Sequence, residues 1–487
     1  MSSVKQLFSQ SVFYGLSTVL PKLLNFLLVF VHTYFFKDAS NYGIVNELYA
    51  YLTILLIILT FGLETGFFRF VSKSYDKEKV YSTLFYFLLF TSILASSIFF
   101  VFSSRIANAL GSVYDSSYIY TLGLIISLDA LMAIPFAKLR IENRPILFSS
   151  IKLFGVFVNI LLNVFFYVIL TPEQHQQLFP NINPIYFIFF SNLVQNVLTL
   201  VVLLVFTRVP KFQFDFSLLK TILRYSFPLL IAGMAGTANE SFDRIFLKYI
   251  LPEESNPLYQ IGIYSANFKL AVLLVLFTQM YRFAAEPFFF NNQDKEDSVQ
   301  VFGKAMKYFV IFCSLIFLFV TFNLPIFKYY IGPSYRSGLL IVPILLIANI
   351  LNGTFFNLSF WYKLTDKTVY GIKYTVIGAS ITILSNFILI PIIGIYGAAL
   401  SRVFTYGFMN FLSYRDGKKS GLISFDTTNL KKYVILFITI LVISTILIFT
   451  KPIFAVVFIN LALLFFVYIF IKTEKINVPY LNRFIKI

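Results

Sequence analysis

Long apolar runs, separated by short polar gaps, follow one another along the whole sequence. A helix needs about 20 apolar residues to cross the hydrocarbon of a membrane. The pattern therefore predicts an all-α integral membrane protein with about 14 transmembrane helices and no soluble domain. The expected spans are residues 10–36, 42–71, 80–103, 117–138, 146–170, 184–207, 222–250, 260–290, 304–328, 337–362, 370–391, 394–414, 432–450 and 453–472. The first run is too long for a signal-peptide core and has no small-residue cleavage site, so we expect it to be retained.

The polar gaps alternate in charge. Alternate gaps, together with the two ends of the chain, hold 27 Lys and Arg residues, whereas the remaining gaps hold 6. Short loops rich in Lys and Arg stay on the cytoplasmic side. We therefore expect both termini to be cytoplasmic and the number of spans to be even.

Composition supports a protein whose main solvent is lipid. Mean hydropathy is +0.81, with 58% hydrophobic and 13% charged residues. The net charge of +17 is spread over short segments that face anionic headgroups, so we expect membrane lipid as a partner and no nucleic acid. The single cysteine, Cys313, lies in an apolar run, which argues against a disulfide framework or a thiolate metal site. No cofactor or metal is expected.

The sequence predicts two related halves. We expect an N-terminal six-helix bundle at 1–207, a cytoplasmic interfacial linker at 208–221, a C-terminal six-helix bundle at 222–414, and two further helices with a cytoplasmic tail at 415–487. Tyr42-Gly43-Ile44 resembles Ile261-Gly262-Ile263 at an offset of 219 residues. Repeats that face each other across a central site are a common design of transporters.

Ionisable and amide side chains within the spans are the candidate site. A charge at mid-bilayer costs about 2.5–3.5 kcal/mol on insertion scales, so such groups face a protein interior or a water-filled cavity. Glu240 and Arg244 are four residues apart and can pair on one helix face, and Arg282 and Glu286 have the same spacing. Lys22 and Lys269 have no evident partner on their own helix. The candidate cavity residues are Lys22, Asn25, Glu64, Asn239, Glu240, Asp243, Arg244, Lys269, Arg282 and Arg402.

Structural roles compete with these functional ones. Asn side chains often hold transmembrane helices together by hydrogen bonds. Arg69 and Lys152 can extend to the cytoplasmic headgroups. Glu240 and Arg244 could form a self-neutralised pair that only sets helix register, and His32 fits a structural role.

Several segments resemble the polysaccharide flippases of the Wzx type, within the multidrug/oligosaccharidyl-lipid/polysaccharide exporter superfamily. The resemblance covers nearly the whole chain. It depends on Gly62–Phe70, on Phe242-Asp243-Arg244 followed by Gly262–Ser265, on Glu286-Pro287-Phe288-Phe289, and on Pro391–Ala399. It implies a MATE-like fold of two pseudo-symmetric bundles in the bacterial cytoplasmic membrane. It also implies alternating access that moves a polyprenyl-pyrophosphate-linked oligosaccharide, an O-antigen, capsular or exopolysaccharide repeat unit, to the outer leaflet. A polysaccharide polymerase and assembly proteins are the expected partners, and Lys22, Glu64, Asp243 and Arg244 are expected near the central cavity.

Other functions remain open at this point. A MATE-type cation-coupled multidrug exporter would favour an aromatic cavity with one acidic residue. An integral-membrane glycosyltransferase or polysaccharide polymerase would need catalytic groups in sizeable external loops, and the external gaps are short. The sequence has no Walker, HExxH or nucleophile-elbow motif, so we expect a transporter rather than an enzyme. Coupling to a proton or sodium gradient would fall to Glu64, Glu240 or Asp243.

Overall fold

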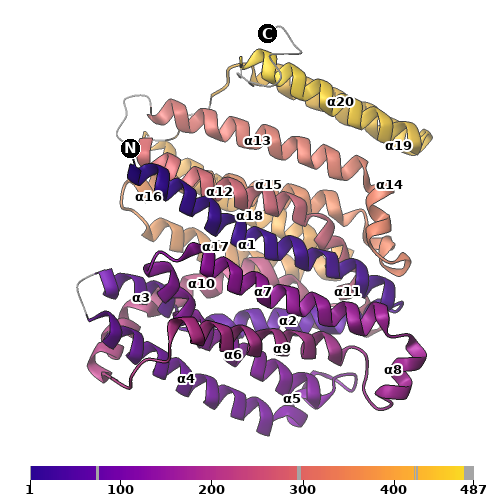
Figure 1. Ribbon diagram of the computed structural model, residues 1–487. Coiled ribbons are helices and arrows are strands. Elements are labelled where there is room, and N and C mark those ends of the chain that lie inside the picture. Colours follow the sequence, from indigo (N-terminus) through magenta and orange to yellow (C-terminus); the bar gives the residue numbers. More distant parts are fainter. Residues whose placement is uncertain (1, 73–75, 293–297, 422, 424–425, 476–487) are drawn as a thin grey trace.

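The computed structural model describes residues 2–72, 76–292, 298–421, 423 and 426–475, with nearly all side chains from residue 19 onward (Figure 1). The expected tail beyond residue 475 lies outside the described residues, as do the basic residues Lys73, Lys295, Arg483 and Lys486.

The described residues form helices and connecting loops, without a strand, as the sequence predicts. The first part of the chain contains α1 (Ser2–Phe35), α2 (Ala39–Thr60), α3 (Leu63–Ser72), α4 (Lys77–Val101), α5 (Ser103–Leu110), α6 (Ser116–Ile141), α7 (Pro145–Val164) with a π-helical turn at Phe165–Ile169, α8 (Pro172–Leu178) and α9 (Tyr186–Thr207). The second part contains α10 (Phe216–Ile250), α11 (Pro257–Leu270), α12 (Val272–Asn292), α13 (Ser298–Phe322), α14 (Leu324–Phe327), α15 (Ile341–Leu358), α16 (Phe360–Leu364), α17 (Val369–Ile393), α18 (Ile395–Lys418), α19 (Leu430–Thr450) and α20 (Pro452–Thr473).

Each of the fourteen predicted spans coincides with helix. By length and composition, eleven spans of the described chain can cross a membrane, or twelve if α11 and α12, bent by 48°, are one span. Two predicted spans fall outside that count. One is α1, whose described apolar part is Val19–Phe35, and the other is α18, which carries Arg402.

The helices pack in two groups, visible as the indigo-to-magenta and orange parts of Figure 1. In the first group, α4, α6, α7 and α9 pack on one another, and in the second group α10, α15, α17 and α18 do so. The groups meet where α1 and α2 contact α10, α11 and α12. The hairpin of α19 and α20 packs on α13, at the edge of the second group. The expected bundle limits at residues 207 and 414 stay a prediction.

Two glycines allow the groups to approach closely. A β-carbon on Gly43 would overlap the backbone carbonyl of Leu258, and one on Gly262 would overlap that of Ala39. The two contacts are related by the same offset of 219 residues that the sequence shows. Small residues let transmembrane helix backbones touch in this way. The crossing lies near the first turns of α2 and α11, at the end of the molecule away from α3 and the start of α10.

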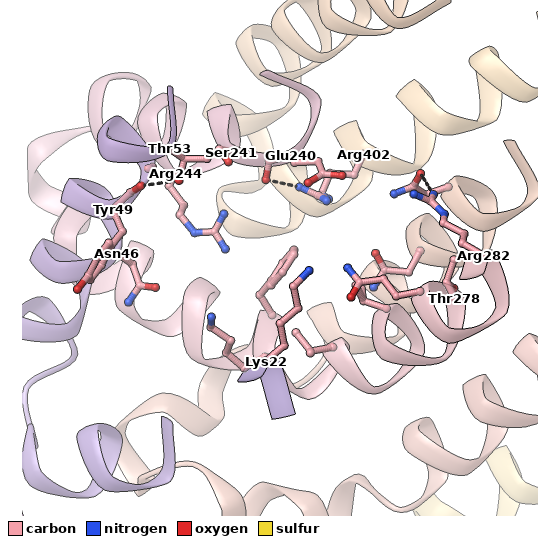
Figure 2. Close-up of a pocket in the computed structure, with 18 residues that line it drawn as sticks. Lys22, Asn46, Tyr49, Thr53, Glu240, Ser241, Arg244, Thr278, Arg282 and Arg402 are labelled. Atoms are coloured by element: carbon pink, nitrogen blue, oxygen red, sulfur yellow. Dashed lines mark hydrogen bonds between the residues drawn. The ribbon is translucent and has the colours of Figure 1, made fainter. Parts of the chain in front are cut away.

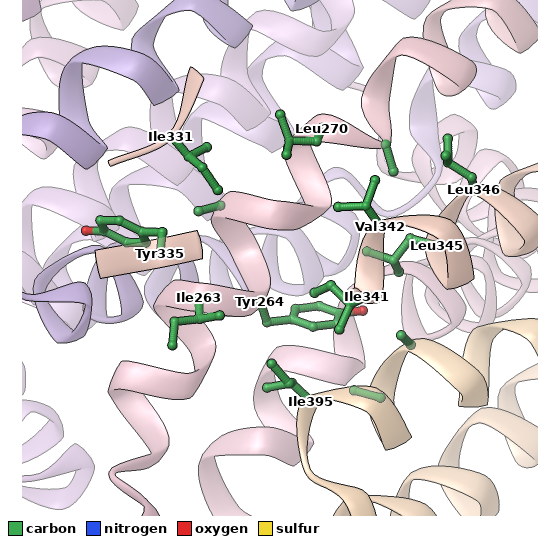
Figure 3. Close-up of a cluster of buried hydrophobic side chains, with 14 of the residues drawn as sticks. Ile263, Tyr264, Leu270, Ile331, Tyr335, Ile341, Val342, Leu345, Leu346 and Ile395 are labelled. Atoms are coloured by element: carbon green, nitrogen blue, oxygen red, sulfur yellow. The ribbon is translucent and has the colours of Figure 1, made fainter. Parts of the chain in front are cut away.

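An apolar core fixes α11 within the second group. Figure 3 shows Ile263, Tyr264 and Leu270 of α11 packed against Ile341 and other residues of α15 and α18. Tyr264 and Ile341 have no exposed surface, and Ile263 and Leu270 are 3% exposed. This packing fixes the backbone of the last turn of α11, from which the side chain of Lys269 extends.

The linker prediction at 208–221 is partly wrong, because α10 begins at Phe216. The side chain of Asp215 accepts a hydrogen bond from the backbone N–H of Leu218 and so caps the helix six residues earlier than expected. The extended part is held by α4, where Ser82 donates to the carbonyl of Lys211 at 2.9 Å. The exposed ring of Phe212 fits the predicted place among headgroups.

Candidate functional site

A cavity of about 340 Å³ lies where the two groups of helices meet. Figure 2 shows side chains from both groups that point into it. We call it the central chamber. Its lining residues are Lys22, Asn46, Tyr49, Ala50, Thr53, Glu240, Ser241, Arg244, Phe268, Lys269, Val272, Val275, Thr278, Gln279, Arg282, Asn349, Asn352 and Arg402.

The central chamber is strongly cationic. Among the described residues that line it, five are basic, and Glu240 is the one acidic side chain. The basic residues come from α1, α10, α11, α12 and α18 and are Lys22, Arg244, Lys269, Arg282 and Arg402. A low-dielectric surrounding strengthens the electrostatic interactions of these charges. The net positive charge of the lining therefore favours an anionic occupant.

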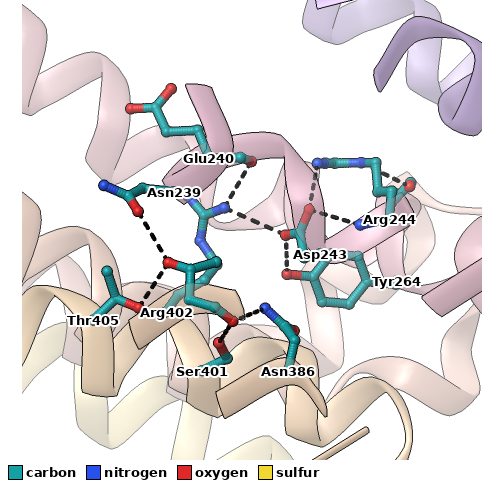
Figure 4. A network of polar contacts seen from close by, with 11 residues as sticks. Asn239, Glu240, Asp243, Arg244, Tyr264, Asn386, Ser401, Arg402 and Thr405 are labelled. Carbon is teal, nitrogen blue, oxygen red and sulfur yellow. Dashed lines mark hydrogen bonds and ion pairs between the residues drawn. The ribbon is translucent and has the colours of Figure 1, made fainter. Parts of the chain in front are cut away.

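Asp243 lies behind the chamber and fixes two of the arginines (Figure 4). Its carboxylate accepts from Arg244 at 3.2 Å, from Arg402 at 3.3 Å and from the hydroxyl of Tyr264 at 2.6 Å. Arg402 also donates to the backbone carbonyl of Glu240 at 2.8 Å. The predicted pair of Glu240 with Arg244 is therefore wrong. Arg244 pairs with its neighbour Asp243 because Arg402 and Tyr264, which belong to other helices, hold that carboxylate in place.

Arg282 and Glu286, four residues apart on α12, do not pair with each other in this structure. Arg282 donates to Asn352 of α15 at 3.2 Å, and its guanidinium lies 4.8 Å from the ring centroid of Phe356. Glu286 pairs instead with Lys363 at 3.2 Å. The partners of Arg282 and Glu286 thus come from α15 and α16 and not from α12 itself.

Several polar groups of the chamber have hydrogen-bonding capacity to spare. In the part of the chain that the structure describes, neither Lys22 nor Lys269 makes a hydrogen bond or ion pair. The Nε atoms of Arg282 and Arg402 and the Oε1 atom of Gln279 are buried without a partner. Buried polar groups are normally hydrogen-bonded, so these point to a bound ligand or water.

Three other predicted residues lie outside the chamber. Asn25 lines an adjoining pocket of about 240 Å³, where His32 bonds Asn163 at 2.7 Å. Glu64 lines a separate cavity and is ion-paired to Arg140. Asn239 is buried and accepts from Thr382 at 3.0 Å, a structural contact between α10 and α17. The structure therefore gathers Lys22, Glu240, Arg244, Lys269, Arg282 and Arg402 in one place, with Asp243 supporting them.

An ionic contact that the sequence reasoning missed connects the two groups near the Gly43 crossing. Glu47 of α2 is completely buried, and Lys248 of α10 lies 3.7 Å from its Oε2 atom. The Tyr114 hydroxyl donates to the same carboxylate and accepts from Lys248 at 3.0 Å. Tyr51 donates to the other carboxylate oxygen at 3.0 Å. Glu47 is an ionisable residue inside a predicted span, and this position could have indicated a buried polar contact. Lys248 lies at the end of its predicted span, where a basic residue is expected to reach the headgroups.

The fold is shared with known membrane transporters. A lipid II flippase MurJ in an inward closed conformation matches with a TM-score of 0.74 and 13% identity, over 96% of this chain and 100% of that one. A multidrug resistance MATE family transporter, inward-facing, matches with a TM-score of 0.65 and 11% identity, over 83% and 95%. An outward-facing MATE structure gives 0.59 and 13%, over 86% and 96%. At these identities the likeness establishes the fold.

The family assignment comes from a comparison of the amino-acid sequence. No curated protein matches this chain in sequence. The family described as polysaccharide biosynthesis protein matches residues 38–337, which is more than half of the chain. The protein therefore belongs to this polysaccharide biosynthesis family and has the fold of the MurJ and MATE transporters.

Proposed function

We propose that this protein is a flippase for a polyprenyl-pyrophosphate-linked oligosaccharide. The observation that carries the proposal is the central chamber, where cations from both helix groups converge and two lysines form no ion pair with any described residue. A passenger with a pyrophosphate would supply the missing negative charge. The family's place in polysaccharide biosynthesis supports a lipid-linked glycan, such as an O-antigen, capsular or exopolysaccharide repeat unit.

The residue types suit a pyrophosphate. Arg offers a planar fork of donors that matches phosphate oxygens, and Lys offers a compact point charge. Arg402 is held rigidly by Asp243 and by the carbonyl of Glu240, so its remaining donors are pre-oriented. Lys22 and Lys269 are free to follow the phosphates. The polyprenyl tail would remain in the surrounding lipid.

Transport would proceed by alternating access, in which the two helix groups move relative to each other and open the chamber to one side of the membrane at a time. The contacts at Gly43, Gly262 and Glu47 close one end of the molecule in this structure. We propose that this end faces outward, because the opposite end carries the basic loops and would be cytoplasmic together with both termini. Its membrane would be the bacterial cytoplasmic membrane. Separation of α2 from α11 would open the chamber to the outer leaflet.

A coupling ion would act on the acidic group that is least neutralised. Asp243 is held by two arginines, and Glu64 is paired with Arg140. Glu240 lines the chamber, and its carboxylate makes no hydrogen bond or ion pair to any described residue. If a proton or sodium gradient drives the cycle, Glu240 is the proposed coupling residue. A polysaccharide polymerase and assembly proteins are the proposed downstream partners.

Export of organic cations fits the chamber poorly. Five basic side chains repel a cationic drug, and the one acidic lining residue does not offset them. Catalysis is likewise unsupported. The chamber resembles a binding site, and the solved structures that share the fold of this chain are a flippase and a multidrug transporter.

The test is a flipping assay in proteoliposomes. The substrate is a fluorescent polyprenyl pyrophosphate that carries a short oligosaccharide, and its exposure is followed with an impermeant quencher. Lys269→Gln should reduce the rate about 10- to 150-fold, because a hydrogen bond to a charged group contributes about 1.5–3 kcal/mol. Lys451→Gln, which removes an exposed lysine at the end of α19, is the matched control. Undiminished flipping by Lys22→Gln, Lys269→Gln and Arg244→Gln alike would refute the assignment.

A further inference from the structure

A second and larger cavity lies beside Glu64, lined mostly by helices of the first group and by Phe283 of α12. Its volume is about 1000 Å³, at the upper end of the range for ligand pockets. It is lined by Pro21, Leu56, Ile57, Thr60, Glu64, Phe68, Asp129, Met132, Ala133, Phe136, Arg140, Phe148, Lys152, Val156, Gln195, Asn196, Thr199 and Phe283. We call it the side cavity.

The side cavity is balanced in charge, unlike the central chamber. Its described lining contains two acidic side chains, Glu64 and Asp129, and two basic ones, Arg140 and Lys152. Glu64 and Arg140 neutralise each other as an ion pair. The Lys152 ammonium lies 4.6 Å from the ring centroid of Phe148 and has no carboxylate within ion-pair distance among the described residues. With no excess of positive charge, this space is a weak competitor for a pyrophosphate.

The remaining lining suits uncharged, hydroxyl-rich groups. Asp129 accepts from Asn196 at 2.9 Å through one oxygen, and its second oxygen accepts no hydrogen bond from a described residue. The Gln195 amide makes no hydrogen bond in the described part of the chain. A carboxylate accepts hydrogen bonds from hydroxyls, and a side-chain amide both donates to them and accepts from them. The partly exposed ring of Phe136 can pack on the C–H face of a sugar ring.

The side cavity and the central chamber share three helices, α1, α2 and α12, where Arg282 lines the chamber and Phe283 lines the side cavity. On α1, Pro21 lines the side cavity and the next residue, Lys22, lines the chamber. Along α2, Thr53 lines the chamber, whereas Ile57 and Thr60 line the side cavity at helical spacing. A ligand that spans both spaces would therefore follow one face of α2.

We propose that the side cavity binds the uncharged sugars of the passenger while the central chamber holds its pyrophosphate. This inference rests on the proposed function and divides its substrate between two compartments by charge. Discrimination among glycans would then reside in the first helix group, at Asp129 and Gln195, and not in the basic residues.

The experiment measures binding of two lipids to the purified full chain in nanodiscs. One lipid is a polyprenyl pyrophosphate without sugar, and the other is the same lipid with an uncharged disaccharide. Gln195→Leu and Asp129→Asn should each weaken binding of the glycan-bearing lipid about 3- to 10-fold, the effect of losing one or two hydrogen bonds. Both variants should leave the sugar-free lipid within about twofold of wild type. Lys269→Gln should weaken both lipids.

The outcomes separate this inference from the proposed function. Equal loss for both lipids in Gln195→Leu and Asp129→Asn, or no loss for either lipid, would overturn the sugar assignment while the flippase proposal stands. A wild-type protein that binds neither lipid would overturn the flippase proposal itself. Gln195 makes no hydrogen bond to a described residue, so a selective loss in Gln195→Leu does not come from a broken Asp129–Asn196 contact.

Discussion

Replacement of Lys248 by methionine should open the end of the molecule that the Gly43 crossing closes. Lys248 of the second group lies 3.7 Å from Glu47 of the first group, and Glu47 has no exposed surface. Methionine retains the apolar bulk of the lysine stem but removes the charge. The carboxylate of Glu47 then keeps the hydroxyls of Tyr114 and Tyr51 but loses its cation.

The size of the effect follows from the burial of the pair. Removal of one partner of a buried ion pair costs about 3–5 kcal/mol, because the other charge remains uncompensated. With two hydroxyls still donating, we take the lower value. That cost applies to the closed state alone, where the groups meet, so the equilibrium shifts toward the open state by about 3 kcal/mol, or about 150-fold.

The assay uses a single reporter cysteine in the chamber. Cys313, the one cysteine of the chain, is replaced by alanine, and Thr53, which is exposed in the chamber lining, is replaced by cysteine. An impermeant maleimide added from the closed end should label Lys248→Met much faster than the parent. Lys451→Met is the control. Adding Glu47→Gln to Lys248→Met removes the uncompensated charge and should slow labelling again. Labelling that Lys248→Met leaves unchanged would refute this reasoning.

Three further predictions concern other contacts. Gly262→Leu should prevent α2 from closing on α11, because a side chain at this position overlaps the backbone carbonyl of Ala39. Maleimide should then label the same chamber cysteine faster from the closed end, and labelling at the parent's rate would contradict the close contact at Gly262. Lys307→Met should detach the hairpin of α19 and α20, because Lys307 is buried between Asp426 at 2.7 Å and Glu474 at 3.2 Å, and limited proteolysis near residue 430 would show it. The donation by Lys307 lowers the pKa of Asp426 to about 2, so the stabilisation is complete above the ordinary pKa of about 4 and is lost as pH falls through 2. Thermal unfolding measured from pH 8 to pH 5 should therefore show no change from this pair.

The helices were predictable because burial in lipid depends on the length of each apolar run. Hydropathy alone located α4, α9 and α17, whose spans are strongly apolar on average. Their ends were less certain, since a local capping contact such as that of Asp215 decides where a helix begins. The short helices α5 and α8 were not predicted, because neither is long enough to leave a hydropathy signal.

The central chamber was predictable only as a set of residues. The cost of a charge in lipid indicated that Lys22, Lys269 and Arg402 face an interior, and the structure brings them together. Their partners were not predictable from spacing along one helix. Arg402 reaches Asp243 from α18, and no pattern within α10 contains that contact. The same holds for Glu47 and Lys248, which meet only because α2 and α10 pack together.

The most direct test of the account is whether the closed end must open for transport. Ser40 of α2 and Asn256, which precedes α11, contact each other across the two groups at 3.4 Å. With Cys313→Ala, Ser40→Cys and Asn256→Cys, oxidation should join the groups by a disulfide, and flipping of the lipid-linked oligosaccharide in proteoliposomes should be measured before and after reduction. The cross-linked protein should not flip the lipid, and reduction should restore the rate. Flipping at the full rate by fully cross-linked protein would contradict this prediction.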